Sequence, residues 1–210
     1  MKTLTLMKKR IMYDSSPVLY DQPVTVKSLQ DEWTIHQSEW CVTNGWLQGK
    51  NRGNWPGMAI MKKNFPGNVI VTFDASTVFP STHDINVMWN GEWLKSENRR
   101  GVAYVAGLQG WWNGKVGIEK SPDYKFMTGT PLFKFEPGTI YHIKAGSIDG
   151  HCFIFADDNL LLETMDPDPI DNQEHTKIGF EAYSSTIRIK NIAIRQVHWE
   201  PVDLTYDPEF

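Results

Sequence analysis

Several features that would place the chain in other protein classes are scarce or missing. Its 210 residues include only two cysteines, Cys41 and Cys152, each within an apolar run, so at most one disulfide is available and a pair of buried free thiols is the alternative. No apolar run is long enough to span a membrane, and no such run follows Lys8-Lys9-Arg10 to make a secretory signal. We therefore expect a cytoplasmic location.

Positive charge is also scarce. Lys and Arg number 21 against 25 Asp and Glu, which gives a formal net charge of -4. The basic runs Lys8-Lys9-Arg10, Lys62-Lys63 and Arg99-Arg100 are short and scattered, as expected of solvated surface or strand edges. Because nucleic-acid binding relies on clustered Lys and Arg, nucleic acid is not an expected partner.

Helical periodicity is absent apart from one short turn near Ser28 to Glu32, whereas alternation of apolar and polar residues recurs throughout. The chain is therefore predicted to be nearly all β. The candidate strands are Trp33–His36, Trp40–Thr43, Trp46–Lys50, Met58–Lys62, Val69–Ala75, Asp84–Trp89, Val102–Gln109, Lys115–Lys120, Tyr141–Ser147, His151–Ala156, Leu160–Glu163, Lys177–Tyr183 and Ile187–Val197.

The stretch Tyr141 to Val197 carries the clearest pattern. Alternating runs broken at Asp149-Gly150 and at Asp157-Asp158-Asn159, then a polar loop and two further runs, predict four antiparallel strands joined by hairpins and one longer return. A dozen short strands at this spacing predict one domain, a jelly-roll β-sandwich of two antiparallel sheets, with residues 1–30 as an N-terminal extension packed on it.

Four segments, in order over about two thirds of the chain, resemble the YesU-like family of the concanavalin A-like lectin/glucanase superfamily. They are Asn64-Phe-Pro-Gly-Asn-Val-Ile-Val-Thr-Phe-Asp74, Gly117-Ile-Glu-Lys-Ser121, Asp157-Asp-Asn-Leu-Leu-Leu-Glu-Thr-Met-Asp166 and Lys177-Ile-Gly-Phe180. The resemblance implies a twisted double sheet with a concave face on which related proteins bind or cleave saccharides, and an association with breakdown of plant cell-wall polysaccharide. The Glu-x-Asp-x-x-Glu strand of superfamily glucanases is missing, so no catalytic residue carries over.

Alternation nominates the residues of the concave groove. Ile85, Val87 and Trp89 suit the core, which leaves Asp84, Asn86, Met88 and Asn90 on the opposite face, as a sugar site or an ordinary exposed face. On the next strand Gly107 shares a face with Gln109 and Trp111, and a mid-strand glycine often marks the close approach of a ligand or another backbone. Trp111 is expected either to stack on a sugar ring or to cover the end of the core.

Two carboxylates are the minimum for ordinary glycoside hydrolysis. Glu119 points outward with Lys115, and Glu181 points outward with Tyr183, so these two glutamates are the candidate catalytic pair. The alternative is that they form salt bridges with Lys115 and Arg188 on an exposed sheet. The residues expected to contact the ligand are Asp84, Asn86, Asn90, Gln109, Trp111, Lys115, His142 and Tyr183.

Other chemistries have weaker support. A lyase would need a base and a cation next to an acidic carbon, for which His142, Lys144, Lys115 and Tyr183 are the candidates. No histidine pair has metal-ligand spacing, so no metal or other cofactor is expected; the carboxylates of Asp166-Pro-Asp-Pro-Ile-Asp171 could ligate a structural Ca²⁺, with a rigid surface loop as the alternative.

The sequence thus favours an intracellular protein that cleaves a glycosidic bond of a plant-derived saccharide or glycoside, by hydrolysis or elimination. The first alternative is a carbohydrate-binding protein without catalysis. The second is a subunit of a larger complex, in which the loops Asn54-Trp55-Pro56 and Trp111-Trp112 would anchor an interface. The sequence leaves the oligomeric state open.

Overall fold

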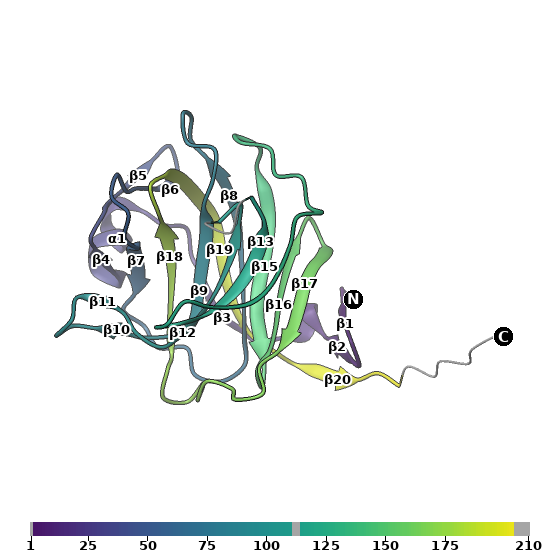
Figure 1. Cartoon of the computed structure of the whole chain (residues 1–210). Coiled ribbons are helices and arrows are strands. Elements are labelled where there is room, and N and C mark those ends of the chain that lie inside the picture. The colour runs from purple at the N-terminus through teal and green to yellow at the C-terminus, as the bar shows by residue number, and fades with distance from the viewer. Residues whose placement is uncertain (1, 111–113, 204–210) are drawn as a thin grey trace.

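Two antiparallel sheets packed face to face form the body of the molecule, in a computed structural model that describes residues 2–110 and 114–203 (Figure 1). The first, called here the seven-stranded sheet, has the order β14 (Lys125–Thr130), β13 (Val116–Ser121), β12 (Ala103–Leu108), β9 (Ile85–Gly91), β18 (Lys177–Ala182), β7 (Gly57–Met61) and β4 (Trp33–His36). The all-β prediction is confirmed.

The second, called the eight-stranded sheet, has the order β17 (Asn159–Met165), β16 (His151–Ala156), β15 (Tyr141–Ile148), β8 (Val69–Thr77), β19 (Thr186–Gln196), β6 (Trp46–Lys50) and β5 (Glu39–Thr43), and β3 (Val18–Asp21) also pairs with β19. Cys41 on β5 and Cys152 on β16 are both free and lie near opposite edges of this sheet, so the question of a disulfide is answered: they do not pair.

The core lies between the two sheets and follows the predicted alternation. Phe73 on β8 meets Phe180 on β18 edge to face, with ring centroids 4.9 Å apart. Trp89 on β9 donates its indole N–H to Ser147 Oγ on β15 at 3.0 Å, which satisfies a polar atom that would otherwise be buried without a partner. Inward residues of both sheets thus lock the layers together.

The stretch from Tyr141 to Val197 forms five strands, β15 to β19, which agrees with the five candidate ranges there and exceeds the four strands that the hairpin pattern predicted. The hairpin turns fall where the sequence placed them: Asp149 and Gly150 have φ of 49° and 81°, as a tight turn with left-handed residues requires. After β17 the chain crosses to the other sheet as β18 and returns as β19, so the longer return is a change of layer.

The N-terminal segment lies on the outside of the eight-stranded sheet. β1 (Leu4–Leu6) and β2 (Lys9–Ile11) pair with each other, and β2 also pairs with β20 (Trp199–Pro201), which brings the two ends of the chain together (Figure 1). Leu4, Leu6 and Ile11 form a second apolar cluster with the outer faces of β8 and β16. This cover explains why every residue of β16 is buried.

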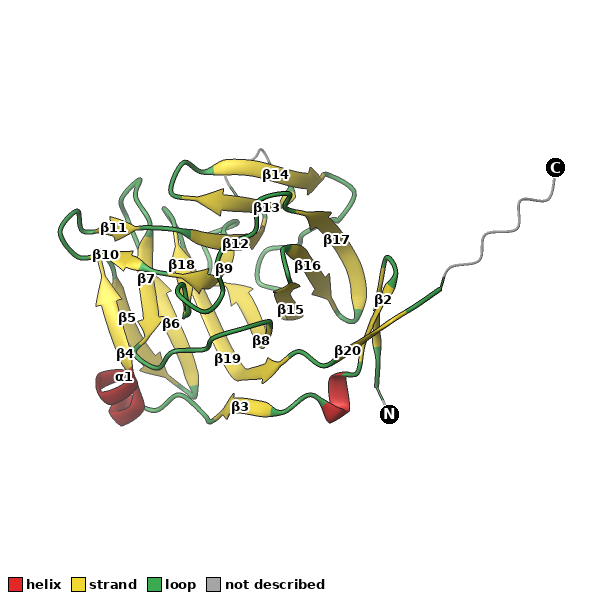
Figure 2. Ribbon diagram, turned by 90° about the horizontal axis from the view of Figure 1, so that it is seen from below, coloured by secondary structure: helices red, strands yellow, loops and turns green. Residues whose placement is uncertain are grey.

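Among the described residues two short helical pieces occur, and Figure 2 shows both at the periphery: η1 (Tyr13–Ser15) and α1 (Val26–Glu32). Thr25 caps α1 by accepting the amide of Ser28, whose hydroxyl accepts the Thr25 amide in turn, so the predicted turn near Ser28 begins as a capping box. No helix in the described part of the chain has the length and apolar character to cross a membrane.

The hairpin of β10 (Trp93–Leu94) and β11 (Arg99–Arg100) projects from the outer side of the seven-stranded sheet (Figure 2). Trp93 packs on an apolar cluster of outward residues that includes Met58, Met88 and Val105. Part of this outer face is therefore covered, and the hairpin ends at the position from which Arg100 enters the site described next.

Candidate functional site

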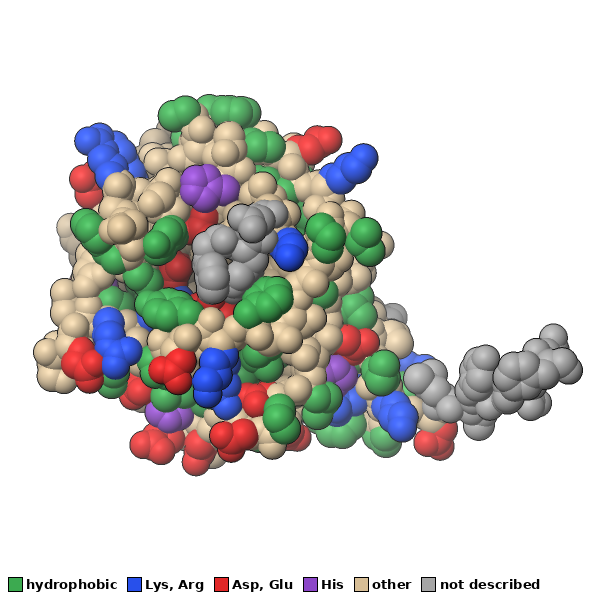
Figure 3. Space-filling model, viewed as in Figure 1, with side chains coloured by type: hydrophobic (Ala, Val, Ile, Leu, Met, Phe, Trp, Pro, Cys, Tyr) green, Lys and Arg blue, Asp and Glu red, His purple; other side chains and the backbone are tan. Residues whose placement is uncertain are grey.

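A hollow of about 490 Å³ opens beside the covered part of the seven-stranded sheet. We call it the Arg100 hollow, and it is lined by Asn54, Trp55, Pro56, Arg100, Tyr124, Glu181 and Tyr183. In the space-filling view of Figure 3, acidic side chains are visible in a depression of the surface, with hydrophobic side chains along part of its rim. Aromatic walls and a charged floor make this the candidate functional site.

Arg100 is the centre of the floor. Its side chain is 1% exposed, and its guanidinium donates to Glu181 through Nη1, to Glu119 through Nη2 at 2.5 Å and to Ser121 Oγ through Nε at 3.0 Å. Burial alone would lower the pKa of Arg100, but Glu181 and Glu119 raise it, so the guanidinium stays charged. One cation thus holds two buried carboxylates.

Glu119 and Glu181 meet although their strands are not neighbours. Glu119 on β13 pairs with Val105 of β12, and Glu181 on β18 pairs with Asn86 of β9, so the two backbones are three strand spacings, roughly 14 Å, apart. Because both side chains reach the two ends of one guanidinium, their bonded oxygens lie no more than about 7 Å apart. The prediction that both glutamates point from one face is confirmed.

The Arg99-Arg100 pair behaves differently from the prediction. Arg99 is a surface residue, paired with Glu97 at 2.6 Å, but Arg100 turns inward and is buried. The alternative of glutamate salt bridges on an exposed sheet is correct in kind and wrong in partner and place, because the partner is neither Lys115 nor Arg188 and the bridge is buried. The sequence indicated this role of Arg100 only indirectly, because Arg100 lies in the connection between β9 and β12, the two strands whose polar faces were predicted to line the groove.

Asp84 lies behind Glu181 and is 1% exposed. It has a left-handed φ of 77°, its Oδ1 accepts from Asn86 Nδ2 at 2.9 Å, and its Oδ2 is buried without a hydrogen-bond partner among the described residues. Burial, with the nearby charges of Glu181 and Glu119, raises the pKa of Asp84 well above its usual value. The site therefore holds a carboxyl group that favours its protonated form.

Asn86 links Asp84 to the floor of the hollow. Its Nδ2 also donates to Glu181 Oε1 at 3.4 Å, and it faces Gly107 on the neighbouring strand. A Cβ at Gly107 would lie 1.9 Å from Asn86 Oδ1, so this glycine makes room for the amide. Gly107 does mark a close approach, but the nearest group is the Asn86 side chain and not the predicted ligand or backbone.

Aromatic side chains form the walls. The Trp55 indole donates to the carbonyl of Gln37 in the turn between β4 and β5 at 3.1 Å, and the Tyr183 hydroxyl donates to the carbonyl of Asn54, the residue before Trp55, at 2.8 Å. The guanidinium of Arg100 stacks 5.2 Å from the ring centre of Tyr124. Trp55 was predicted only as an interface residue, and Tyr124 was missed because its neighbours show no clear alternation.

Asn90 and Lys115, two of the predicted ligand contacts, lie elsewhere, and Gln109 meets the site through its backbone. Asn90 has φ of 44°, which breaks the alternation, so its side chain turns inward and accepts from Ser147 Oγ at 3.0 Å. Gln109 follows the end of β12, and it is its carbonyl that accepts the Asp84 amide at 3.0 Å. Lys115 precedes Glu119 by four residues, roughly 13 Å along the strand. Trp111 and Trp112 lie outside the described residues.

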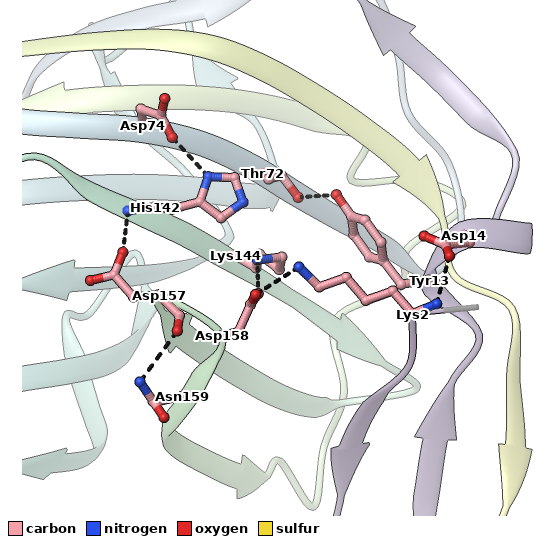
Figure 4. Close-up of polar contacts among 10 residues, drawn as sticks. All are labelled: Lys2, Tyr13, Asp14, Thr72, Asp74, His142, Lys144, Asp157, Asp158 and Asn159. Atoms are coloured by element: carbon pink, nitrogen blue, oxygen red, sulfur yellow. Dashed lines mark hydrogen bonds and ion pairs between the residues drawn. The ribbon is translucent and has the colours of Figure 1, made fainter.

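The prediction for His142 in the same groove is wrong. His142 and Lys144 are on β15, on the outer face of the other sheet, where Figure 4 shows them with Asp74, Asp158 and Tyr13. His142 Nδ1 lies 2.7 Å from Asp74 Oδ1, and the buried Lys144 contacts Asp158. The sequence could not separate the two outer faces, since alternation identifies an outward residue without identifying its sheet. The residues suggested for a lyase are therefore not brought together.

The candidate calcium loop is tied down by protein groups. Asp166 accepts from the Tyr104 hydroxyl at 2.8 Å and from Lys120 Nζ at 2.8 Å, and Asp171 Oδ1 accepts the amide of Gln173 at 2.8 Å. The described residues contain no group of three or more His, Cys, Asp or Glu side chains placed to hold a metal ion. The calcium interpretation stays a prediction.

Comparisons with known proteins place the fold. No family model and no curated protein matches the sequence. Among solved structures, the chain is similar to the carbohydrate-binding module CBM66 from Bacillus subtilis, with a TM-score of 0.61 and 15% identity over 78% of this chain and 95% of that one. A protein of unknown function with a galectin-like fold from Bacillus subtilis gives a TM-score of 0.64 and 15% identity over 86% of this chain and 96% of that one.

The potassium-bound carbohydrate recognition domain of Emp46p gives a TM-score of 0.59 at 11% identity, over 85% of this chain and 96% of that one. At such identities the likeness concerns the fold alone. Together with the two antiparallel sheets, it shows that the chain is an all-β sandwich with the galectin-like, concanavalin A-like lectin fold.

Proposed function

We propose that this protein binds a saccharide in the Arg100 hollow. The observation that carries the proposal is the combination of three aromatic side chains, Trp55, Tyr124 and Tyr183, around a floor of charged hydrogen-bonding groups. Sugar rings present apolar C–H faces, which suit aromatic rings, and hydroxyl edges, which suit carboxylates and guanidinium groups. The hollow offers both within one concave surface.

The floor is prepared for binding before a ligand arrives. Arg100 is held by two carboxylates and a hydroxyl, and Glu181 is held by Arg100 and Asn86. Groups fixed in this way lose little conformational freedom when a ligand binds, so more of the interaction energy contributes to affinity.

Similar proteins support the class of ligand by analogy. One neighbouring structure is a carbohydrate-binding module and another is a carbohydrate recognition domain. The resemblance to the YesU-like family points the same way, and a plant-derived saccharide and an intracellular location remain part of the proposal. Fold likeness alone does not assign function, so the argument rests on the hollow.

Binding leads over cleavage because of Arg100. In a two-carboxylate mechanism the scissile bond lies between the two carboxyl groups, with about 5 to 9.5 Å between them. Here the space between Glu119 and Glu181 is taken by the guanidinium that both contact. A substrate would have to displace a buried ion pair before either glutamate could act.

Glycosidic-bond cleavage is the second candidate, and Asp84 favours it. A carboxyl group held protonated next to an ionised one is the arrangement of a general acid and a base. Asp84 is 1% exposed, so Glu181 would first have to release Arg100 and move aside. Asp84 could then give its proton to the leaving oxygen, while Glu181 takes a proton from the attacking water. Asp84 would then be the catalytic acid, a role for which Glu119 and Glu181 had been predicted.

The test is a binding screen with product analysis. Wild-type protein is titrated by calorimetry with hemicellulosic and pectic oligosaccharides, and each mixture is then analysed for shorter products. Trp55→Ala is expected to weaken binding at least tenfold. Trp199 on β20 is also exposed, 38% against 48% for Trp55, and Trp199→Ala is expected to leave binding unchanged.

Each outcome decides between the readings. Binding without product supports the first candidate, and product that disappears in Asp84→Asn supports the second. Binding that Trp55→Ala leaves intact contradicts the assignment to this hollow. A stable hetero-complex by native mass measurement, with no saccharide bound, would instead favour the subunit interpretation.

A further inference from the structure

The charges in and behind the Arg100 hollow do not balance. Glu119 and Glu181 carry two negative charges when ionised and Arg100 carries one positive charge, so the floor has a net charge of about -1 before Asp84 is counted. We propose that the ligand of the hollow is an uncharged sugar, and that sugars carrying a carboxylate are excluded. This inference rests on the proposed saccharide-binding function.

Arg100 has little capacity left for an anionic ligand. A guanidinium has five N–H groups, and three are used by Glu119, Glu181 and Ser121. The bidentate geometry by which arginine grips a carboxylate needs two parallel N–H donors on one side, and the two glutamates already hold both terminal nitrogens. An incoming carboxylate would have to compete with buried partners that are fixed by the fold.

Three cations of the neighbouring strands and turns are already paired with acidic side chains. Arg99 pairs with Glu97, Lys120 lies 2.8 Å from Asp166, and Lys125 lies near Asp123. The negative field also acts on Asp84: beyond the effect of burial, Glu181 and Glu119 help to keep its proton bound. A ligand carboxylate at this floor would meet the same repulsion.

Sugar hydroxyls suit the floor better. Carboxylates only accept hydrogen bonds, so an acceptor-rich floor selects ligand groups that donate, and a hydroxyl can donate to Glu181 while accepting from a remaining N–H of Arg100. A uronic acid replaces one such hydroxyl group by a charged acceptor. At hydrogen-bonding range and an effective dielectric constant of about 20, repulsion between the ligand carboxylate and one net negative charge of the floor predicts at least a tenfold loss of affinity.

The experiment compares oligosaccharides that differ only in charge. Galacturonan oligomers are titrated as free acids and as full methyl esters, and cello-oligosaccharides are titrated with and without oxidation at C6. We expect the neutral member of the pair that binds to bind at least tenfold more tightly. An acid that binds as tightly as its neutral partner, or more tightly, overturns this inference and leaves the proposed function standing.

If no member of either series, and no sugar of the wider panel, binds, the proposed function fails as well, so the two failures are distinguishable. Two further measurements check the cause. Raising the salt concentration from 20 to 500 mM is expected to reduce the ratio of the affinity for the neutral sugar to the affinity for the acid, since salt screens the repulsion. Glu119→Gln, which removes one negative charge, is expected to narrow it too; a ratio unchanged in both measurements contradicts the electrostatic cause.

Discussion

Replacing Arg100 by Met tests whether the floor of the hollow is a buried ion cluster. Met keeps most of the apolar length of the side chain and removes the charge, which leaves Glu119 and Glu181 buried without their common cation. Removing one partner of a buried ion pair typically costs about 3 to 5 kcal/mol, because the remaining charge stays desolvated. For a chain of this length, that loss corresponds to a melting temperature roughly 6 to 20 °C lower.

The neighbouring residue supplies the control. Arg99 is exposed and pairs with Glu97 on the surface, so Arg99→Met is expected to cost less than about 1 kcal/mol. Thermal and urea unfolding of the two variants, measured side by side at pH 7, give the comparison. The variant that combines Arg100→Met with Gln at both glutamate positions is expected to regain most of the lost stability, since no unpaired charge remains.

The reasoning would be refuted by an Arg100→Met variant as stable as Arg99→Met. It would also be refuted if the combined variant were no more stable than Arg100→Met alone, because the loss would then reflect packing and not buried charge.

Three other predictions concern single positions. Gly107→Ala is expected to lower the free energy of unfolding by roughly 1 to 3 kcal/mol, because the new methyl group displaces Asn86. Adding Asn86→Ala should restore part of that loss in urea unfolding, and a double variant as unstable as Gly107→Ala alone would contradict the contact. Asp84 holds its proton to a higher pH in the folded protein than in the unfolded chain, so its stabilising contribution is present at low pH and is lost as the pH rises above about 4, by up to about 1.4 kcal/mol per pH unit. Asp84→Asn should therefore be more stable than wild type at pH 7 and lose that advantage near pH 4; a constant difference would refute the raised pKa. On the outer face of the other sheet, Lys144 lowers the pKa of Asp158 to about 2, so this pair stabilises the protein above pH 4 and less as the pH falls toward 2. Asp158→Asn leaves the buried Lys144 without this partner and is expected to cost roughly 1 to 2 kcal/mol of stability at pH 7, a figure reduced because Asp158 is half exposed. Lys144→Met should be nearly neutral, and a lower melting temperature for Lys144→Met than for Asp158→Asn would contradict this.

The sequence predicted the layers of the fold well for a geometric reason. Side chains of a strand alternate strictly, so the inward set Ile85, Val87 and Trp89 could be read without knowing the neighbouring strands. The same rule placed Glu119 and Glu181 outward. It failed at Asn90, where a left-handed residue interrupts the alternation within the strand.

Features that depend on distant partners were beyond this reasoning. β1, β2 and β20 form a sheet from the two ends of the chain, and three-residue strands carry no periodic signal. β14 was missed because its residues are half-exposed on both faces, so no alternation develops. These strands owe their existence to pairing and not to local pattern.

The site was predicted in part for the same reason. Strand alternation found Asp84, Asn86, Glu119 and Glu181, but the residue that joins the two glutamates comes from a hairpin that folds back over the sheet. Nothing in the pair Arg99-Arg100 distinguishes the exposed arginine from the buried one. Arg100 is the one that turns inward because Glu119 and Glu181 on the sheet bind its guanidinium.

The most direct test of the central claim is to map the ligand by nuclear magnetic resonance, using the tightest-binding neutral oligosaccharide of the screen. We expect the shift changes to centre on Trp55, Tyr124 and Tyr183, around the Arg100 hollow. Changes centred instead on the outer face of the eight-stranded sheet, around His142 and Lys144, would contradict the account.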